Sequence, residues 1–172
     1  MKILLLFNFI ALPFGIFCQS DSFTTFSSKN YQISYPDLWE FDTSKMMGTT
    51  FFIFSPLEND SDTFRENVNF VIQDLSGQDI NLETYKQISD AQFENLLKKE
   101  DIIESTIIKS GQKEYFRASY LMTQGKFRLK ITSICYLANK KAYLLTFTSE
   151  LSKYDSYKET GEKILASFKL IE

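Results

Sequence analysis

The 172-residue sequence contains no histidine, and its only cysteines are Cys18 and Cys135. The absence of histidine excludes Ser-His-Asp triads, Cys-His dyads, histidine metal sites and histidine pH switches. Two cysteines so far apart exclude CxxC redox motifs and zinc–cysteine clusters. The six glycines are scattered and form no phosphate-binding loop. These absences remove most common enzyme classes, and we expect a protein with no catalytic residue, no metal site and no cofactor.

Positive charge in excess is also absent. The chain has 19 Lys and Arg against 22 Asp and Glu, which gives a formal net charge of −3. Proteins that bind nucleic acid need a basic face that replaces the counterions of the phosphates. We therefore expect no nucleic-acid partner. Aromatic residues, in contrast, are abundant at 16%, with seventeen Phe and nine Tyr, as in a strand-rich globular domain.

The first residues have the pattern of a secretion signal. Lys2 precedes an apolar run, residues 3–17, that is short for a membrane span. We predict a signal peptide at residues 1–18 and one mature domain at residues 19–172, exported to the periplasm or the exterior. No transmembrane segment is expected after removal of the signal.

Three alternatives to cleavage after Cys18 remain. They are cleavage after Ser20, lipidation of Cys18 as in bacterial lipoproteins, and retention of the segment as a membrane anchor. The bulky Phe17 argues against lipidation, because a small residue usually precedes the modified cysteine. Without Cys18 the mature chain keeps only Cys135, which cannot form an internal disulfide, so the domain must be held by its core. Cys135 shares the apolar face of its predicted strand with Ile131, and we expect a buried thiol.

Hydrophobic periodicity predicts strands over most of the chain. Tyr31, Ile33 and Tyr35 alternate with polar residues, Pro36 ends that strand, and the only tryptophan, Trp39, is expected to anchor the core. Residues 21–30 are expected to be a lead-in or a short edge strand. Further strands are predicted at residues 49–55, 68–74, 102–109, 113–122, 127–137 and 142–148.

Two segments have helical spacing, residues 81–99 and 152–168. Asn81 is a suitable N-cap, and Lys98 and Lys99 suit the C-terminal end of the first helix. The last four strands are separated by short turns, which is typical of an antiparallel meander. Both faces of that meander carry apolar side chains, so each needs a covering layer. The predicted fold is α+β, a single antiparallel β-sheet flanked by helices in an α/β/α sandwich.

One part of the predicted sheet is polar. If both hairpins have two-residue turns, Glu104 lies opposite Arg117 and Ser119 lies opposite Lys130 on the same face. We expect this polar part to be open and to offer a partner surface. Its candidate residues are Glu104, Arg117, Ser119, Arg128 and Lys130. The alternative interpretation is a solvated edge with salt bridges.

An acidic loop follows the strand at residues 49–55. Glu58, Asp60 and Asp62 provide oxygen ligands of the kind that calcium prefers. The loop lacks the glycine and the distal glutamate of an EF-hand, and polar loops are ordinarily solvated. We expect a surface loop here rather than a metal site.

Four motifs follow one another along the chain. They are the opening YQISYPDLW at residues 31–39, the turn at Gly111 that enters a long strand, KAYLLTFT at residues 141–148, and the closing ILASF at residues 164–168. In this order they resemble the PsbP-like family, whose fold is shared with the Ran-binding Mog proteins. The likeness covers roughly residues 26–170. It implies an antiparallel sheet between helices and a non-catalytic role, and many bacterial members are exported. Nothing in the residues points to a photosystem partner.

The predicted function is therefore that of an exported, non-catalytic binding module. Its partner is expected to be a protein or another component of the cell envelope. The alternative is a carrier of a small molecule or lipid, with a pocket between sheet and helix lined by Phe and Tyr side chains. A carboxylate hydrolase is a weaker third hypothesis, because no pair of carboxylates is brought together by sequence alone.

Overall fold

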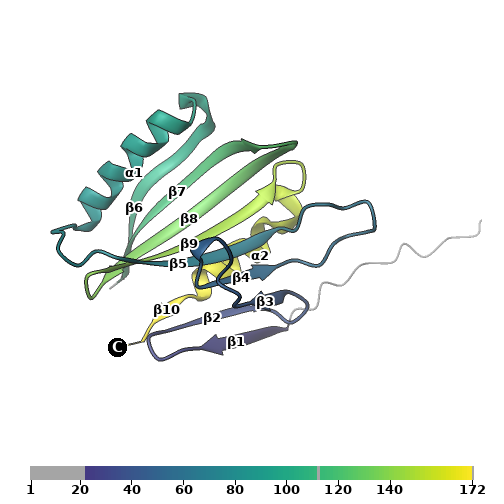
Figure 1. Ribbon diagram of the computed structural model, residues 1–172, viewed down its shortest axis with the longest axis horizontal. Helices are drawn as coiled ribbons and strands as arrows, with labels where there is room; N and C mark the ends of the chain where they lie inside the picture. The colour runs from purple at the N-terminus through teal and green to yellow at the C-terminus, as the bar shows by residue number, and fades with distance from the viewer. Residues whose placement is uncertain (1–21, 112, 172) are drawn as a thin grey trace, which may run out of the picture.

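The computed structural model describes residues 22–111 and 113–171 (Figure 1). The predicted signal peptide at residues 1–18, its cleavage and the lipidation of Cys18 lie outside these residues. The first half of the described chain contains β1 (Phe23–Ser27), β2 (Tyr31–Pro36), β3 (Glu40–Asp42), η1 (Met46–Gly48), β4 (Phe51–Phe54), β5 (Asn67–Asp74) and α1 (Leu82–Leu96). The second half contains η2 (Lys99–Asp101), β6 (Ile102–Ser110), β7 (Lys113–Gln124), β8 (Phe127–Ala138), β9 (Lys141–Glu150), α2 (Tyr154–Ser167) and β10 (Lys169–Leu170).

The strands form two antiparallel sheets. The larger sheet has seven strands in the order β3-β4-β5-β9-β8-β7-β6, and the smaller has three in the order β1-β2-β10. The prediction of a single sheet is wrong on this point. The opening strand β2 pairs with the short strands β1 and β10 instead of joining the meander. β10 has only two residues, Lys169 and Leu170, and so short a strand leaves no periodic signal in the sequence.

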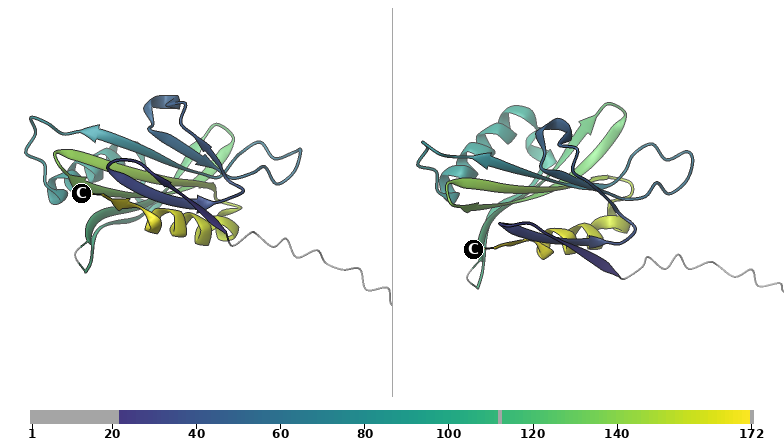
Figure 2. Two further views of the ribbon diagram at one scale, coloured as in Figure 1. Left: turned by 90° about the horizontal axis from the view of Figure 1, so that it is seen from below. Right: turned by 60° about the horizontal axis from the view of Figure 1, so that its bottom comes forward.

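The predicted sandwich is confirmed, with one addition. α1 packs against β6 and β7 on one face of the large sheet, and α2 packs against β9 and β5 on the other. Figure 2 shows the small sheet on the same side of the large sheet as α2, and α2 also packs against β2. The fold class is therefore α+β, with antiparallel strands flanked by helices. Among the described residues, no helix is both long and apolar enough to cross a membrane.

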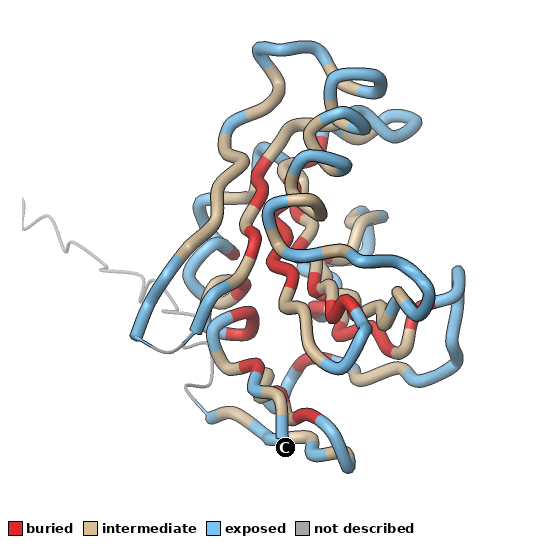
Figure 3. The backbone as a smooth tube through the Cα atoms, turned by 90° about the vertical axis from the view of Figure 1, so that its left-hand side faces the viewer, coloured by how far each residue is buried: buried red, intermediate tan, exposed pale blue. Residues whose placement is uncertain are grey.

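The main core lies between the large sheet, α2 and the small sheet, and it is rich in aromatic rings. Tyr31 from β2 contacts Phe70 from β5 and Phe168 at the end of α2, with ring centroids 4.8 and 5.9 Å apart. Trp39 is buried and contacts Tyr157 of α2, which confirms its role as a core anchor. Buried segments follow the central strands in Figure 3, whereas the outer loops are exposed.

α1 covers the opposite face loosely. Asn81 caps the helix as predicted, because its side chain accepts a hydrogen bond of 2.9 Å from the backbone N–H of Thr84. The helix ends at Leu96, so the predicted placement of Lys98 and Lys99 in its last turn is wrong. None of its side chains is fully buried, and Leu96 is 74% exposed. The helix contacts a second, smaller cluster around Phe116, Ala118, Cys135 and Ala142.

The register of the meander differs from the predicted one by two residues. Glu104 lies opposite Ser119, and Lys130 lies opposite Leu121, whereas Arg117 and Ser119 had been expected there. Gly111 and Gly125 are the first residues of their two-residue turns, with φ of 60° and 58°. The prediction placed each glycine second. Moving a turn by one residue along the chain shifts the cross-strand partner of each residue by two positions. Because side chains alternate between the two faces of a strand, a shift of two leaves each residue on the same face.

Candidate functional site

Arg117 is held between two carboxylates. Its Nε lies 3.1 Å from Glu104 Oε2, and its two terminal nitrogens lie 3.1 and 2.5 Å from the oxygens of Glu162 on α2. The hydrogen bonds to Glu162 raise the pKa of Arg117 above its usual value. Bidentate contact with a carboxylate fixes the plane of the guanidinium group. Arg117 therefore ties β7 to α2.

Arg128 and Lys130 lie further along the same sheet face. Arg128 forms an ion pair with Asp101 and donates a hydrogen bond of 3.1 Å to Thr123 Oγ1. The Nζ atom of Lys130 lies 3.8 Å from the ring centroid of Tyr154, the first residue of α2. The ammonium is attracted to the face of the ring by a cation–π interaction. These side chains leave part of their charged ends at the protein surface.

Ser119 is buried, with 4% of its surface exposed, and its hydroxyl lies 3.3 Å from that of Thr132. Thr132 is also fully buried. The prediction that this part of the sheet is open is wrong at these two positions, because α2 lies across it and contributes Glu162 and Tyr154. The structure thus places the five candidate residues on one face, with Ser119 beneath the surface and the four charged residues in contact with neighbouring groups.

Replacing Arg117 with methionine should destabilise the protein by about 2 kcal/mol at pH 7, because Glu104 and Glu162 lose the cation that they share while remaining partly buried. Urea unfolding followed by circular dichroism measures this change. Lys109→Met is the matched control, because its ion pair with Glu114 is exposed. Equal stability of the two variants would contradict a structural role for Arg117.

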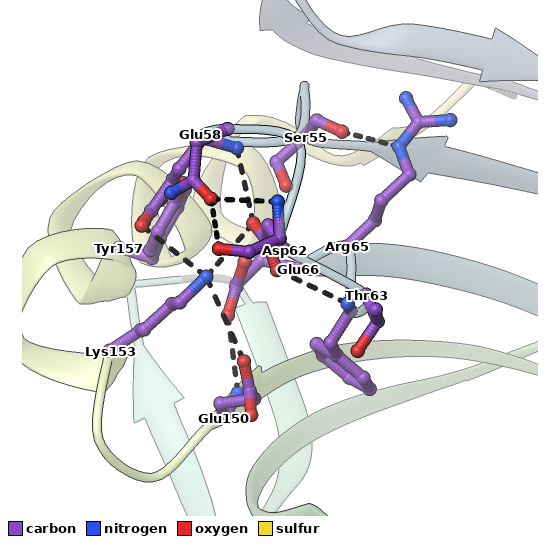
Figure 4. A network of polar contacts seen from close by, with 12 residues as sticks. Ser55, Glu58, Asp62, Thr63, Arg65, Glu66, Glu150, Lys153 and Tyr157 are labelled. Carbon is purple, nitrogen blue, oxygen red and sulfur yellow. Dashed lines mark hydrogen bonds and ion pairs between the residues drawn. The ribbon is translucent and has the colours of Figure 1, made fainter.

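A second polar cluster, which we call the Lys153 network, joins the acidic loop to the start of α2 (Figure 4). The Nζ atom of Lys153 lies 2.9 Å from Asp62 Oδ2, 3.3 Å from Glu58 Oε2 and 3.7 Å from Glu150 Oε2. Tyr157 Oη donates a hydrogen bond of 3.0 Å to Glu58 Oε1. Burial lowers the pKa of Lys153, but its hydrogen bonds to Asp62 and Glu58 outweigh that effect and raise it overall.

Asp62 organises the acidic loop. Its carboxylate accepts hydrogen bonds from the backbone N–H groups of Glu58 (3.1 Å) and Phe64 (3.2 Å) as well as from Lys153. The Lys153 contact, with these two, lowers the pKa of Asp62 to about 2. Only 3% of the Asp62 side chain is exposed, whereas Glu58 and Asp60 are exposed as expected, so the expectation of a solvated surface loop fails at Asp62. The ammonium group of Lys153 occupies the position among these carboxylates that a bound metal cation would take.

Glu66 lies beneath this loop and is completely buried. Its Oε1 accepts weak hydrogen bonds from Ser149 Oγ (3.4 Å) and the backbone N–H of Glu150 (3.3 Å). Its Oε2 has no hydrogen-bond partner, and neither does the Oγ of Ser55, which is paired with Glu66 through the backbone. Burial raises the pKa of Glu66, and this effect exceeds the opposing hydrogen bonds to its carboxylate.

Beyond the acidic loop, little in the sequence predicts this network. Lys153 and Asp62 are 91 residues apart, so only the tertiary fold brings them together. One signal was present: Glu66 directly precedes the alternating strand β5 and lies on the same side as Val68 and Phe70, the buried residues of that strand. Glu66 is in phase with the buried positions of the strand that follows it, and this pattern predicts a buried carboxylate.

The described residues contain no arrangement typical of catalysis. No group of three or more Asp, Glu or Cys side chains among them is placed to hold a metal ion. Cys135 is buried as predicted, and burial raises the pKa of its thiol to about 12. A thiol with so high a pKa is almost entirely protonated near neutral pH and is a poor nucleophile.

A groove beside α1 has a volume of about 540 Å³. Phe93, Leu97 and Ile102 provide its apolar lining, and Asp90, Glu94, Lys99 and Ser105 provide polar groups. Two exposed apolar residues lie next to lining residues in the chain, Leu96 and Ile103. A smaller cavity of about 190 Å³ lies between Trp39, the small sheet and α2. The groove beside α1 is within the size range of small-molecule sites.

The architecture defines a class of protein before any comparison: an α+β domain whose antiparallel meander lies between two helices, with a second small sheet. The family model described as PsbP matches residues 21–170. The chain therefore belongs to the PsbP family, which confirms the resemblance seen in the sequence. A search of curated proteins finds no match.

Solved structures share the fold at low sequence identity. The cyanobacterial PsbP protein CyanoP from Synechocystis has a TM-score of 0.60 and 16% identity, over 94% of this chain and 99% of that one. LpqN from Mycobacterium tuberculosis has a TM-score of 0.60 and 10% identity, over 89% of this chain and 87% of that one. A protein from Bacteroides thetaiotaomicron has a TM-score of 0.56 and 14% identity, over 86% of this chain and 48% of that one.

Proposed function

We propose that this protein is an exported, non-catalytic accessory protein that binds a protein or another component of the cell envelope. The observation that carries the proposal is membership of the PsbP family over nearly the whole chain. The signal-like N-terminus and the missing catalytic chemistry agree with it. LpqN, which shares the fold, is described as involved in cell envelope biogenesis.

The proposed binding surface is the end of the large sheet around the β7–β8 turn. Arg128 and Lys130 provide partly accessible positive charge there, and the exposed Lys126 follows Gly125 in the turn. Arg117, Glu104 and Ser119 support these residues from the covered part of the sheet. Charged groups at the rim of an interface chiefly determine the rate and specificity of association.

Reversing both exposed charges, with Arg128→Glu and Lys130→Glu together, should remove the partner from pull-downs of envelope extracts of the native host. Lys109→Glu with Lys113→Glu is the matched control, because it makes the same charge change at the exposed turn between β6 and β7. The control should retain the partner. An unchanged set of partners with the Arg128 and Lys130 double variant would contradict the proposed surface.

A carrier of apolar small molecules is the second candidate, and the groove of about 540 Å³ beside α1 favours it. A fluorescent fatty acid is a suitable probe because its emission increases in an apolar site. Binding should occur with wild type and fall at least tenfold in Leu97→Trp, which fills the groove. Absence of binding by wild type, or equal binding by the variant, would reject this candidate.

A further inference from the structure

The segment that covers Glu66 has the structure of a lid. It comprises residues 57–65, and its tip is a turn in which the Asp62 N–H donates to Asn59 O over 3.0 Å. Several contacts hold the lid to the body of the protein. Lys153 pairs with Asp62 and Tyr157 with Glu58, both within the Lys153 network. Outside that network, Phe64 packs against Phe127 with ring centroids 5.0 Å apart, Thr63 accepts a hydrogen bond of 2.9 Å from Lys126, and Arg65 pairs with Glu40.

Beneath the lid, two buried polar atoms lack partners, Ser55 Oγ and Glu66 Oε2. Their residues are paired through the backbone, one directly after β4 and the other directly before β5, because the Ser55 N–H donates to Glu66 O over 2.8 Å. An ionised carboxylate offers only acceptors, so Glu66 in that form leaves Oε2 buried without a donor. The Ser55 hydroxyl, which can donate as well as accept, makes no hydrogen bond to this oxygen, so a negative charge on Glu66 would be buried without a compensating donor. Protonation removes that charge and with it the cost of burying it.

The charges around Glu66 also favour the neutral form. The groups near Glu66 come from several elements: Glu58 and Asp62 from the lid, Glu150 from β9, and Lys153 and Tyr157 from the start of α2. Arg65 points away from Glu66, and Lys130 of β8 lies opposite Ser149. Arg65 is engaged by Glu40 at 2.7 Å, and Lys130 by the ring of Tyr154. The remaining nearby cation is Lys153, which Glu58, Asp62 and Glu150 already share. A negative charge on Glu66 would be the fourth in this cluster and would have no counter-ion of its own.

We propose that residues 57–65 form a pH-gated lid, which is closed while Glu66 carries a proton and opens when Glu66 releases that proton to solvent. Opening separates Asp62 and Glu58 from Lys153 and exposes the polar row of Ser55, Glu66 and Ser149. The proposed lid does not depend on the proposed binding function, because the argument for it uses only contacts within the chain.

The direction of the pH dependence follows from linkage. Burial raises the pKa of Glu66 when the lid is closed, so closure is favoured at low pH and is lost as pH rises through that raised pKa. Asp62 acts in the opposite direction, because its pKa of about 2 weakens closure only in strong acid. Each unit by which closure raises the pKa of Glu66 gives a tenfold change in the lid equilibrium.

Amide hydrogen exchange at residues 57–65, compared between wild type and Glu66→Gln at matched pH from 4 to 8, tests the lid. Glutamine mimics the neutral form of Glu66 at every pH. The ratio of the wild-type exchange rate to that of Glu66→Gln should therefore be near one at pH 4 and should increase steadily to pH 8. Asp60→Asn is the control, because this exposed lid carboxylate lies outside the Lys153 network. The ratio of the wild-type exchange rate to that of Asp60→Asn should not change with pH. A flat ratio for Glu66→Gln would overturn the proposal.

A second measurement keeps the test decisive if Glu66→Gln folds poorly. Carboxyl-carbon NMR of wild type with labelled glutamate follows the titration of Glu66 directly. The account expects Glu66 to titrate above the ordinary glutamate value, with lid amide shifts changing over the same pH range. Titration of Glu66 at or below that ordinary value, or lid shifts that do not follow it, would contradict the gate.

Discussion

Replacing Gly161 with alanine should destabilise the protein by about 2–3 kcal/mol. Gly161 lies in α2 where the helix crosses β9, and a Cβ atom there would be 2.6 Å from Cδ1 and Cε1 of the Phe147 ring. Both residues are buried, so neither can move aside without disturbing the main core. At an exposed helical site the same change would stabilise by about 1 kcal/mol, because alanine has the higher helix propensity. Here the steric overlap outweighs that gain.

A double-mutant cycle with Phe147→Leu identifies the cause. Phe147→Leu alone leaves a cavity and reduces stability, but it removes the ring that the new methyl group would meet. In that background Gly161→Ala should have little effect or should stabilise. Urea unfolding of the four proteins gives the coupling energy. The same loss in both backgrounds would show that the close approach of α2 to β9 is not the reason for glycine at this position.

Lys153→Met should reduce stability by about 2–3 kcal/mol at pH 5, where the lid is closed, because it leaves three carboxylates close together without their shared cation. The partial exposure of Lys153 and Glu58 keeps this figure below that of a fully buried pair. Methionine retains the apolar stem, so the change tests charge rather than packing. The lid formed by residues 57–65 should show faster amide exchange in the variant.

The loss of stability in Lys153→Met should become smaller as pH falls into the acidic range. Asp62 has a pKa of about 2 in the folded protein against 3.8 for a free side chain. Its contribution is therefore present above pH 3.8 and is lost as pH falls toward 2. The difference between wild type and variant should be full near pH 5, should narrow below pH 4, and should decline again at the higher pH at which the proposed lid opens. Lys158→Met, which removes an exposed pair with Asp155, is the control and should show little change at any pH.

Much of the fold is predictable from the sequence because it is encoded locally. The alternation at Tyr31, Ile33 and Tyr35, the N-cap Asn81 and the turns at Gly111 and Gly125 all predict features that the structure contains. The second sheet is not predictable in this way. Its outer strands are short, and β10 joins β2 only because the end of α2 returns the chain to Tyr31. Such pairing depends on tertiary packing.

The site was predicted less well than the fold, for a related reason. The five candidate residues were correctly placed on one face, since faces follow from strand period, but their neighbours come from α2, whose position the strand pattern does not give. Glu162 and Tyr154 therefore changed an expected open surface into a partly covered one. Likewise, Lys153 reaches Asp62 only through the packing of α2 beside the acidic loop. Contacts between distant segments carry no sequence period.

Site-specific photo-crosslinking in the native host tests the central proposal most directly. A photoreactive amino acid at position 128 should give a discrete adduct with an envelope component, and the same amino acid at position 109 should give none. The adduct at position 128 should disappear when Lys130→Glu is added. Adducts from position 109 alone, or no adduct from position 128 in intact cells, would contradict an accessory protein that binds its partner through the β7–β8 end of the sheet.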